Sequence, residues 1–179
     1  MINKDAFSNG QIDSKLWLCR ELENLQWTSN LTHIYGGWYG ITAFLLLSRE
    51  KFKVGRIESF DIDPSCEPIA DMINENWVFK EWKFKAHTQD CNDIFGRPDL
   101  IINTSSEHFE TKDWFDNIKT GTRVIIQGNN MPHDDHVIHS TTLDEFINHY
   151  PLTTMDYSGK LDFIYPDWGF TRYMIIGVK

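Results

Sequence analysis

Three glycines and an aspartate have the spacing of a nucleotide-binding turn. Gly36, Gly37 and Gly40 follow an apolar run, LTHIY, and precede a helical run, ITAFLLL. Asp61 follows Gly40 by 21 residues, close to the roughly 20-residue spacing of an acid that holds ribose hydroxyls. Glycine lets the backbone approach a ligand closely, and a helix N-terminus offers unpaired N–H groups. The pattern predicts that the chain binds an adenosine-containing cofactor.

A second group of polar residues follows two later apolar runs. Glu107 and His108 come directly after DLIINT, where a substrate would reach a parallel sheet. A histidine with a pKa near neutrality suits proton abstraction, so both residues are candidate catalytic bases. A loop pair that only caps or hydrogen-bonds locally explains them equally well. The amides of QGNN (127–130) could likewise bind a polar substrate or only satisfy a turn.

The segment MPHDDHVIH holds the largest group of metal-ligating residue types, which are His133, Asp134, Asp135, His136 and His139. Such side chains could bind a divalent metal or shape a substrate entrance. Short His/Asp clusters are also common on solvated loops, and that interpretation is favoured. We therefore predict no metal.

Alternating patterns predict the elements that would position these residues. We expect strands at 31–35, 56–62, 84–88, 99–104 and 122–127, and helices at 15–25, 41–49, 65–77, 114–118 and 143–150. Ser14 is the expected N-cap of the first helix. The last two strands, 153–165 and 170–179, have no helix between them and predict an antiparallel pair. The expected fold is α/β, a doubly wound seven-stranded sheet with helices on both faces and an antiparallel last strand.

Length and composition limit the alternatives. A chain of 179 residues predicts a single domain, 1–179, with residues 1–30 as an N-terminal helical extension. The net charge of −9 argues against binding to an extended nucleic acid. Three scattered cysteines without metal-ligand spacing, no membrane-spanning apolar run and no apolar leader predict a cytoplasmic protein without a membrane partner.

The order of these features resembles the class I S-adenosylmethionine-dependent methyltransferases over residues 31–179, and the chain is similar to small members carried by tailed bacteriophages. The resemblance implies a Rossmann-like sheet that binds S-adenosylmethionine across the carboxyl ends of its first strands. Gly36, Gly37 and Gly40 would line the methionine and ribose portion, and Asp61 would hold the ribose hydroxyls.

The same resemblance assigns residues farther along the chain. Asp90 would take the adenine amino group, with Cys91 and Asn92 beside the ring. Asn103 and Thr104 would face the transferring methyl group.

Two positions depart from the family's first motif, which runs acid, apolar, Gly, x, Gly, x, Gly. Trp38 replaces the middle glycine and Ile34 replaces the acid, which leaves Trp38 or Tyr39 to pack on the ligand.

The motif after the fourth strand indicates the acceptor. NTSS (103–106) is not the Asn/Asp-Pro-Pro-aromatic turn of nucleobase N-methyltransferases, and no Pro-Cys nucleophile is present. The resemblance implies O- or N-methylation of a small molecule; the sequence indicates no oligomeric state.

Two alternatives to a methyltransferase stay open. An NAD-type oxidoreductase uses the same turn and acid, although GGWYG does not match G-x-G-x-x-G in register. A catalytically silent adenosyl-ligand-binding module would fit the departures in the first motif.

Overall fold

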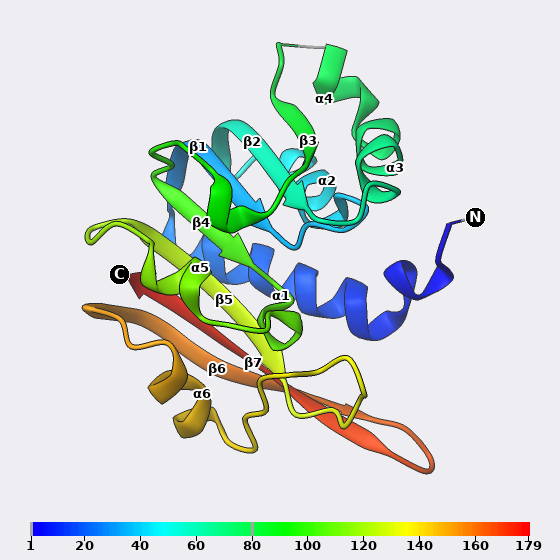
Figure 1. Ribbon diagram of the computed structural model, residues 1–179, viewed down its shortest axis with the longest axis vertical. Coiled ribbons are helices and arrows are strands. Elements are labelled where there is room, and N and C mark those ends of the chain that lie inside the picture. The colour runs from blue at the N-terminus through cyan, green and yellow to red at the C-terminus, as the bar shows by residue number, and fades with distance from the viewer. Residues whose placement is uncertain (1, 80) are drawn as a thin grey trace. The chain divides into compact units, whose positions relative to one another are not determined.

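The computed structural model describes residues 2–79 and 81–179 (Figure 1). Its seven strands form one sheet in the order β3-β2-β1-β4-β5-β7-β6. β2 runs parallel to β1 and β3, whereas β7 runs antiparallel to β5 and β6. The predicted α/β sheet with an antiparallel end is confirmed. None of the helices in the described part of the chain is both long and apolar enough to span a bilayer.

The chain divides into two compact units, the first ending at Ile102 and the second running from Asn103 to Lys179. The expected single domain, 1–179, stays a prediction. The elements of the first unit are η1 (Lys4–Phe7), α1 (Asn9–Leu25), β1 (Thr28–Tyr35), α2 (Ile41–Leu47), β2 (Lys53–Asp61), α3 (Cys66–Ile73), α4 (Glu75–Phe79), β3 (Phe84–Thr88), η2 (Cys91–Asp93) and most of β4 (Leu100–Asn103).

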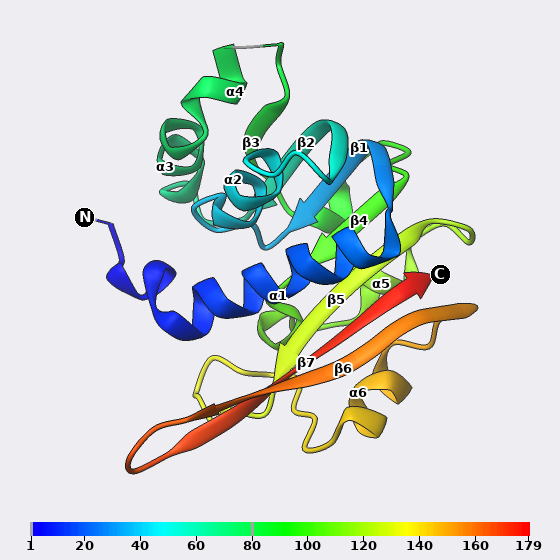
Figure 2. The same ribbon diagram turned by 180° about the vertical axis from the view of Figure 1, so that it is seen from behind.

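The core of the first unit lies between its parallel strands and its longer helices. Leu18 and Leu22 of α1, Leu46 of α2 and Ile57 of β2 are fully buried. α1 packs against α2, and α3 packs against β3. Figure 2 shows α1 in front of the strands of this unit, and Figure 1 shows it behind them, so α1 lies on one face of the sheet.

Two local predictions about helices in this unit are wrong. Ser14 does not cap the first helix, because α1 begins at Asn9 and the Ser14 hydroxyl, fully buried, donates to the Gln11 carbonyl. The single helix expected over 65–77 is broken at Asn74. The Asn74 amide donates to the carbonyl oxygens of Ala70 (2.9 Å) and Gly40 (3.1 Å), a side-chain bond that competes with the helical backbone.

The second unit holds the antiparallel end of the sheet. Its elements are η3 (Ser106–His108), α5 (Asp113–Asp116), β5 (Arg123–Asn129), α6 (Leu143–His149), β6 (Thr154–Ile164) and β7 (Gly169–Val178). Val124, Ile125, Met174, Ile175 and Ile176 are fully buried along the two inner strands. Residues 172–177 of β7 are buried in succession, so the strand does not alternate between buried and exposed positions.

Candidate functional site

The glycine turn closes tightly on the end of β2. Gly36 and Gly40 have φ angles of 61° and 70°, in the left-handed region that favours glycine. Gly37 is required for a different reason, because a Cβ there would lie 1.9 Å from the Ser59 hydroxyl oxygen. The Gly37 amide donates to the carbonyl of Phe60 at 3.0 Å. The turn is therefore fixed against the strand that ends in Asp61.

Asp61 is bonded to this turn. Its Oδ2 accepts from the Trp38 amide at 2.8 Å, and its Oδ1 accepts from the Asp63 amide at 3.0 Å. A carboxylate has about four acceptor positions, so two backbone bonds leave room for two hydroxyl donors. The side chain is half-buried, which keeps it open to a ligand. This hydrogen bond joins the glycine turn to Asp61 across 23 positions of sequence, and the predicted role of Asp61 toward ribose stays a prediction.

The segment after β3 joins the same group. Thr88 lies opposite Asp61 in the parallel register, and the Gln89 amide donates to the Asp61 carbonyl at 2.9 Å. The Asp90 carboxylate accepts from the Asn92 amide at 2.8 Å and caps η2. Asp90 and Asn92 are exposed. Three strand ends of the first unit therefore present Trp38, Asp61 and Asp90 from one edge.

The Cys91 thiol is suited to contact a ligand but not to act as a nucleophile. Burial and, to a smaller extent, the negative charge of Asp90 raise the pKa of its thiol to about 12. A thiol with this pKa stays protonated at neutral pH and is a poor nucleophile.

Trp38 and Tyr39, predicted to pack on a ligand, differ in their surroundings. Tyr39 is buried in a cluster with Ala6 and Cys66, and its hydroxyl accepts from the Asn3 amide at 3.2 Å. The Trp38 ring packs against this cluster, 5.2 Å from the Tyr39 ring, but is only partly buried. Trp38 is left-handed at φ 48°, a conformation that costs energy for a side chain of this size. Of the two aromatic residues, Trp38 keeps surface for a ligand.

A further aromatic and ionisable group lies on β1, β2 and β3. Phe60 stacks on His87 with ring centroids 4.9 Å apart and lies 5.0 Å from His33. Both histidines place Nε2 3.8 Å from a Glu58 oxygen. Burial lowers the pKa of His33 to about 4 against the opposing effect of Glu58. The sequence alone does not reveal this group, because its members are spread over three strands.

Within the second unit, Asn103 and Thr104 lie at the end of β4. Asn103 is fully buried, and its Oδ1 accepts from the Ser105 amide at 2.9 Å. The Thr104 carbonyl accepts from Arg172 Nη1 at 3.2 Å. Nδ2 of Asn103 is buried without a hydrogen-bond partner among residues 2–79 and 81–179. Both residues are hydrogen-bonded, and their predicted role toward the methyl group stays a prediction.

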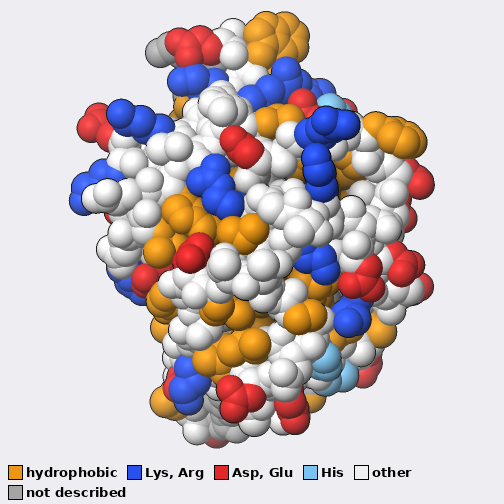
Figure 3. Space-filling view, turned by 90° about the vertical axis from the view of Figure 1, so that its left-hand side faces the viewer, with side chains coloured by type: hydrophobic (Ala, Val, Ile, Leu, Met, Phe, Trp, Pro, Cys, Tyr) orange, Lys and Arg blue, Asp and Glu red, His pale blue; other side chains and the backbone are white. Residues whose placement is uncertain are grey.

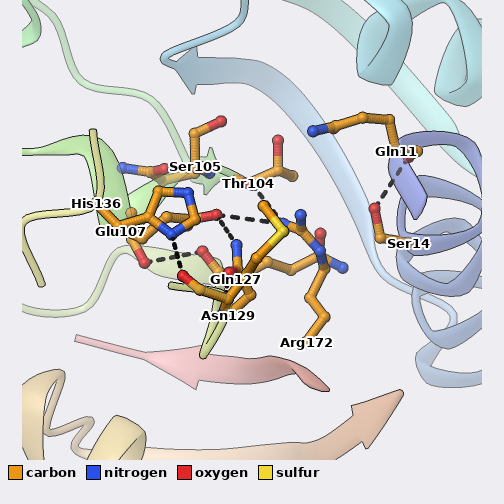
Figure 4. Close-up of polar contacts among 12 residues, drawn as sticks. Gln11, Ser14, Thr104, Ser105, Glu107, Gln127, Asn129, His136 and Arg172 are labelled. Carbon is orange, nitrogen blue, oxygen red and sulfur yellow. Dashed lines mark hydrogen bonds and ion pairs between the residues drawn. The ribbon is translucent and has the colours of Figure 1, made fainter. Parts of the chain in front are cut away.

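Glu107 and His108 follow on η3 in different surroundings. The Glu107 carboxylate is only 3% exposed. Acids are almost never fully buried unless they are paired, and Glu107 has such partners. Its Oε1 accepts from Asn129 Nδ2 and lies 3.7 Å from Arg172 Nη1. Figure 4 shows these contacts as dashed lines that meet at Glu107. His108 is exposed.

The three histidines of the segment after β5 differ in burial. His136 is buried, and its ring centroid lies 4.7 Å from that of His108. His133 and His139 are exposed. Arg172 was not among the residues predicted from the sequence, although a single arginine inside the apolar run of β7 is a signal for a buried ion pair.

Comparison with known proteins bears on the fold. No protein-family model and no curated protein matches the sequence. Among solved structures, the chain is similar to the N-methyltransferase NodS from Bradyrhizobium japonicum WM9, at a TM-score of 0.69 and 13% identity over 96% of this chain and 99% of that one. The chain has the class I methyltransferase fold.

Two further structures of this fold contain a ligand. NodS in complex with S-adenosyl-L-homocysteine matches at a TM-score of 0.69 and 12% identity, over 94% of this chain and 88% of that one. Magnesium protoporphyrin IX methyltransferase from Synechocystis PCC 6803, with the same ligand bound, matches at 0.69 and 11% identity, over 98% of this chain and 88% of that one. The family resemblance noted in the sequence is therefore confirmed at the level of the fold.

Proposed function

We propose that this chain is an S-adenosylmethionine-dependent methyltransferase that acts on an oxygen or nitrogen of a small molecule. The observation that carries the proposal is the gathering of the glycine turn, the Asp61 carboxylate and the Asp90 segment at the carboxyl ends of β1, β2 and β3. In open parallel sheets, ligands bind at this edge.

The residues of this edge fit the proposed cofactor. Asp61 has acceptor positions left for ribose hydroxyls after its two backbone bonds. Trp38 offers a partly exposed aromatic face, and Asp90 and Asn92 offer exposed polar groups for an adenine edge. When bound, S-adenosylmethionine supplies the methyl group. The protein contributes the orientation of donor and acceptor, which is the main requirement of a direct displacement.

The predicted role of Glu107 and His108 as proton acceptors stays a prediction. Oε1 of Glu107 accepts from Asn129 and lies beside the Arg172 guanidinium, so the side chain is held in place. His108 is exposed and has a ring nitrogen that can take a proton.

The small-molecule acceptor is supported by charge. The net charge of −9 disfavours a phosphate backbone. On the face shown in Figure 3, Lys and Arg side chains lie among Asp and Glu side chains. The NodS structure is named as an N-methyltransferase and the Synechocystis structure as a porphyrin methyltransferase. An NAD-dependent oxidoreductase is not favoured, since the structures compared are methyltransferases.

Calorimetric titration with S-adenosylmethionine, S-adenosylhomocysteine and NAD tests the proposal. We expect affinity for the first two near the micromolar range, about −8 kcal/mol, and none for NAD. Binding of NAD alone would overturn the proposal. Binding of the adenosyl ligands without methyl transfer to any amine or hydroxyl acceptor in a radiolabel screen would support the silent binding module instead.

A further inference from the structure

Three side chains of the second unit converge on one point. Glu107, His108 and His136 each offer a ligand atom, and these atoms all lie within 4.8 Å of one another. Glu107 and His136 are buried, whereas His108 is exposed, so the point lies at the surface with a buried floor. In tetrahedral coordination, ligand atoms that are each about 2.0–2.2 Å from one ion lie no more than about 3.6 Å apart. Small side-chain adjustments would bring all three atoms within that limit.

The backbone fixes these side chains from two segments. The Glu107 carbonyl accepts from the Val137 amide at 2.8 Å and from the Ile138 amide at 3.3 Å. These bonds tie the segment that carries His136 to η3. The His108 amide donates to the Ser105 carbonyl at 3.1 Å, which closes the turn of η3. The three residues are thus brought together by main-chain bonds and not by side-chain packing alone.

The hydrogen bond of His136 sets which nitrogen is free. Its Nδ1 lies 2.7 Å from the Met131 carbonyl oxygen, which can only accept, so Nδ1 carries the proton. In the neutral ring Nε2 then holds a lone pair. A histidine whose other nitrogen donates to a backbone carbonyl has the arrangement typical of a metal ligand.

The two oxygens of the Glu107 carboxylate differ in their hydrogen bonding. Oε1 is bonded to Asn129 and faces Arg172, whereas Oε2 is buried without a hydrogen-bond partner among the described residues. An unpartnered buried carboxylate oxygen is costly, and a bound cation would satisfy it. Arg172 is anchored on the Thr104 carbonyl, so its charge stays on the Oε1 side.

We propose that Glu107, His108 and His136 form a binding site for a divalent transition-metal ion. Two imidazoles and one carboxylate suit Zn²⁺ and the neighbouring first-row ions. Three protein ligands leave a coordination position for water or for an oxygen of another molecule. The proposal departs from our expectation of no metal, and it uses only His136 of the five residues of the histidine-rich segment. It does not depend on the proposed methyl transfer, but Glu107 and His108 would not accept a proton while they bind an ion.

The test is titration of the chelator-treated, dialysed protein with Zn²⁺ by calorimetry and with Co²⁺ by visible absorption. We expect one ion per chain and cobalt ligand-field bands. Removing an outer-shell partner of a metal typically lowers the metal affinity at least roughly tenfold. His108→Gln and His136→Gln each remove a direct ligand, so each should lower the affinity for Zn²⁺ by at least that factor. His108 is exposed, so its variant should fold normally.

His139→Gln is the matched control, because it removes an exposed histidine from the same segment, with its ring centroid 6.5 Å from that of His136. Its affinity should equal that of the wild type. Absence of binding by both ions, or equal losses in the control and in His108→Gln, would overturn the site. Circular dichroism of each variant separates loss of the site from loss of the fold.

Discussion

Replacing Asp61 by Asn should separate ligand binding from the integrity of the glycine turn. The two side chains have nearly the same shape, but Asn has one acceptor oxygen and a donor in place of the second. Asp61 uses both oxygens, for the amides of Trp38 and Asp63. The variant must therefore lose one backbone bond and also weaken any bond to a ribose hydroxyl.

The size of both effects follows from hydrogen bonds to a charged group, which contribute about 1.5–3 kcal/mol each. Loss of one ribose bond of that size raises the Kd for S-adenosylhomocysteine by about 10- to 150-fold, since 1.4 kcal/mol is tenfold. Loss of the backbone bond lowers the free energy of unfolding by a similar amount. Calorimetry measures the first quantity and urea denaturation the second.

Asp63→Asn is the matched control. It removes the same charge two residues away, where the Asp63 carboxylate is exposed and accepts from the Ser65 amide. Its affinity for S-adenosylhomocysteine should stay that of the wild type. If Asp61→Asn lowers the stability but leaves the Kd unchanged, Asp61 only fixes the turn and the ribose assignment is refuted.

Two further predictions concern stability. Gly37→Ala should lower the free energy of unfolding by about 1–3 kcal/mol through overpacking. Adding Ser59→Ala should restore most of this stability, because the nearest remaining atom is then the residue 59 Cβ at 3.3 Å. A double-mutant cycle that shows no coupling between the two positions would contradict this. The pKa of His33, about 4 against an ordinary 6.5, means that the unfolded chain takes up the proton first. Stability is then complete above pH 6.5 and falls by about 3 kcal/mol toward pH 4. His33→Gln should remove that part of the slope in urea titrations, and an unchanged slope would show that other groups cause it.

Local patterns were sufficient for most of the elements. The strand expected at 84–88 has those bounds, and the closing antiparallel pair is present at β6 and β7. The predicted helix boundaries were wrong where a side-chain hydrogen bond ends the helix. The helix over 65–77 breaks because the Asn74 amide bonds to carbonyls, one of them on Gly40, 34 residues away. No local window contains that partner.

The sequence by itself determined that the glycine turn and Asp61 lie together, because parallel strands end at the same edge and the spacing of the acid follows from one crossover. Only the tertiary structure decided which histidine meets Glu107. His133, His136 and His139 are alike in sequence, but two backbone bonds to the Glu107 carbonyl place His136 beside it. Likewise, the partners of the Glu107 carboxylate come from β5 and β7, since register across an antiparallel sheet brings Asn129 opposite Arg172.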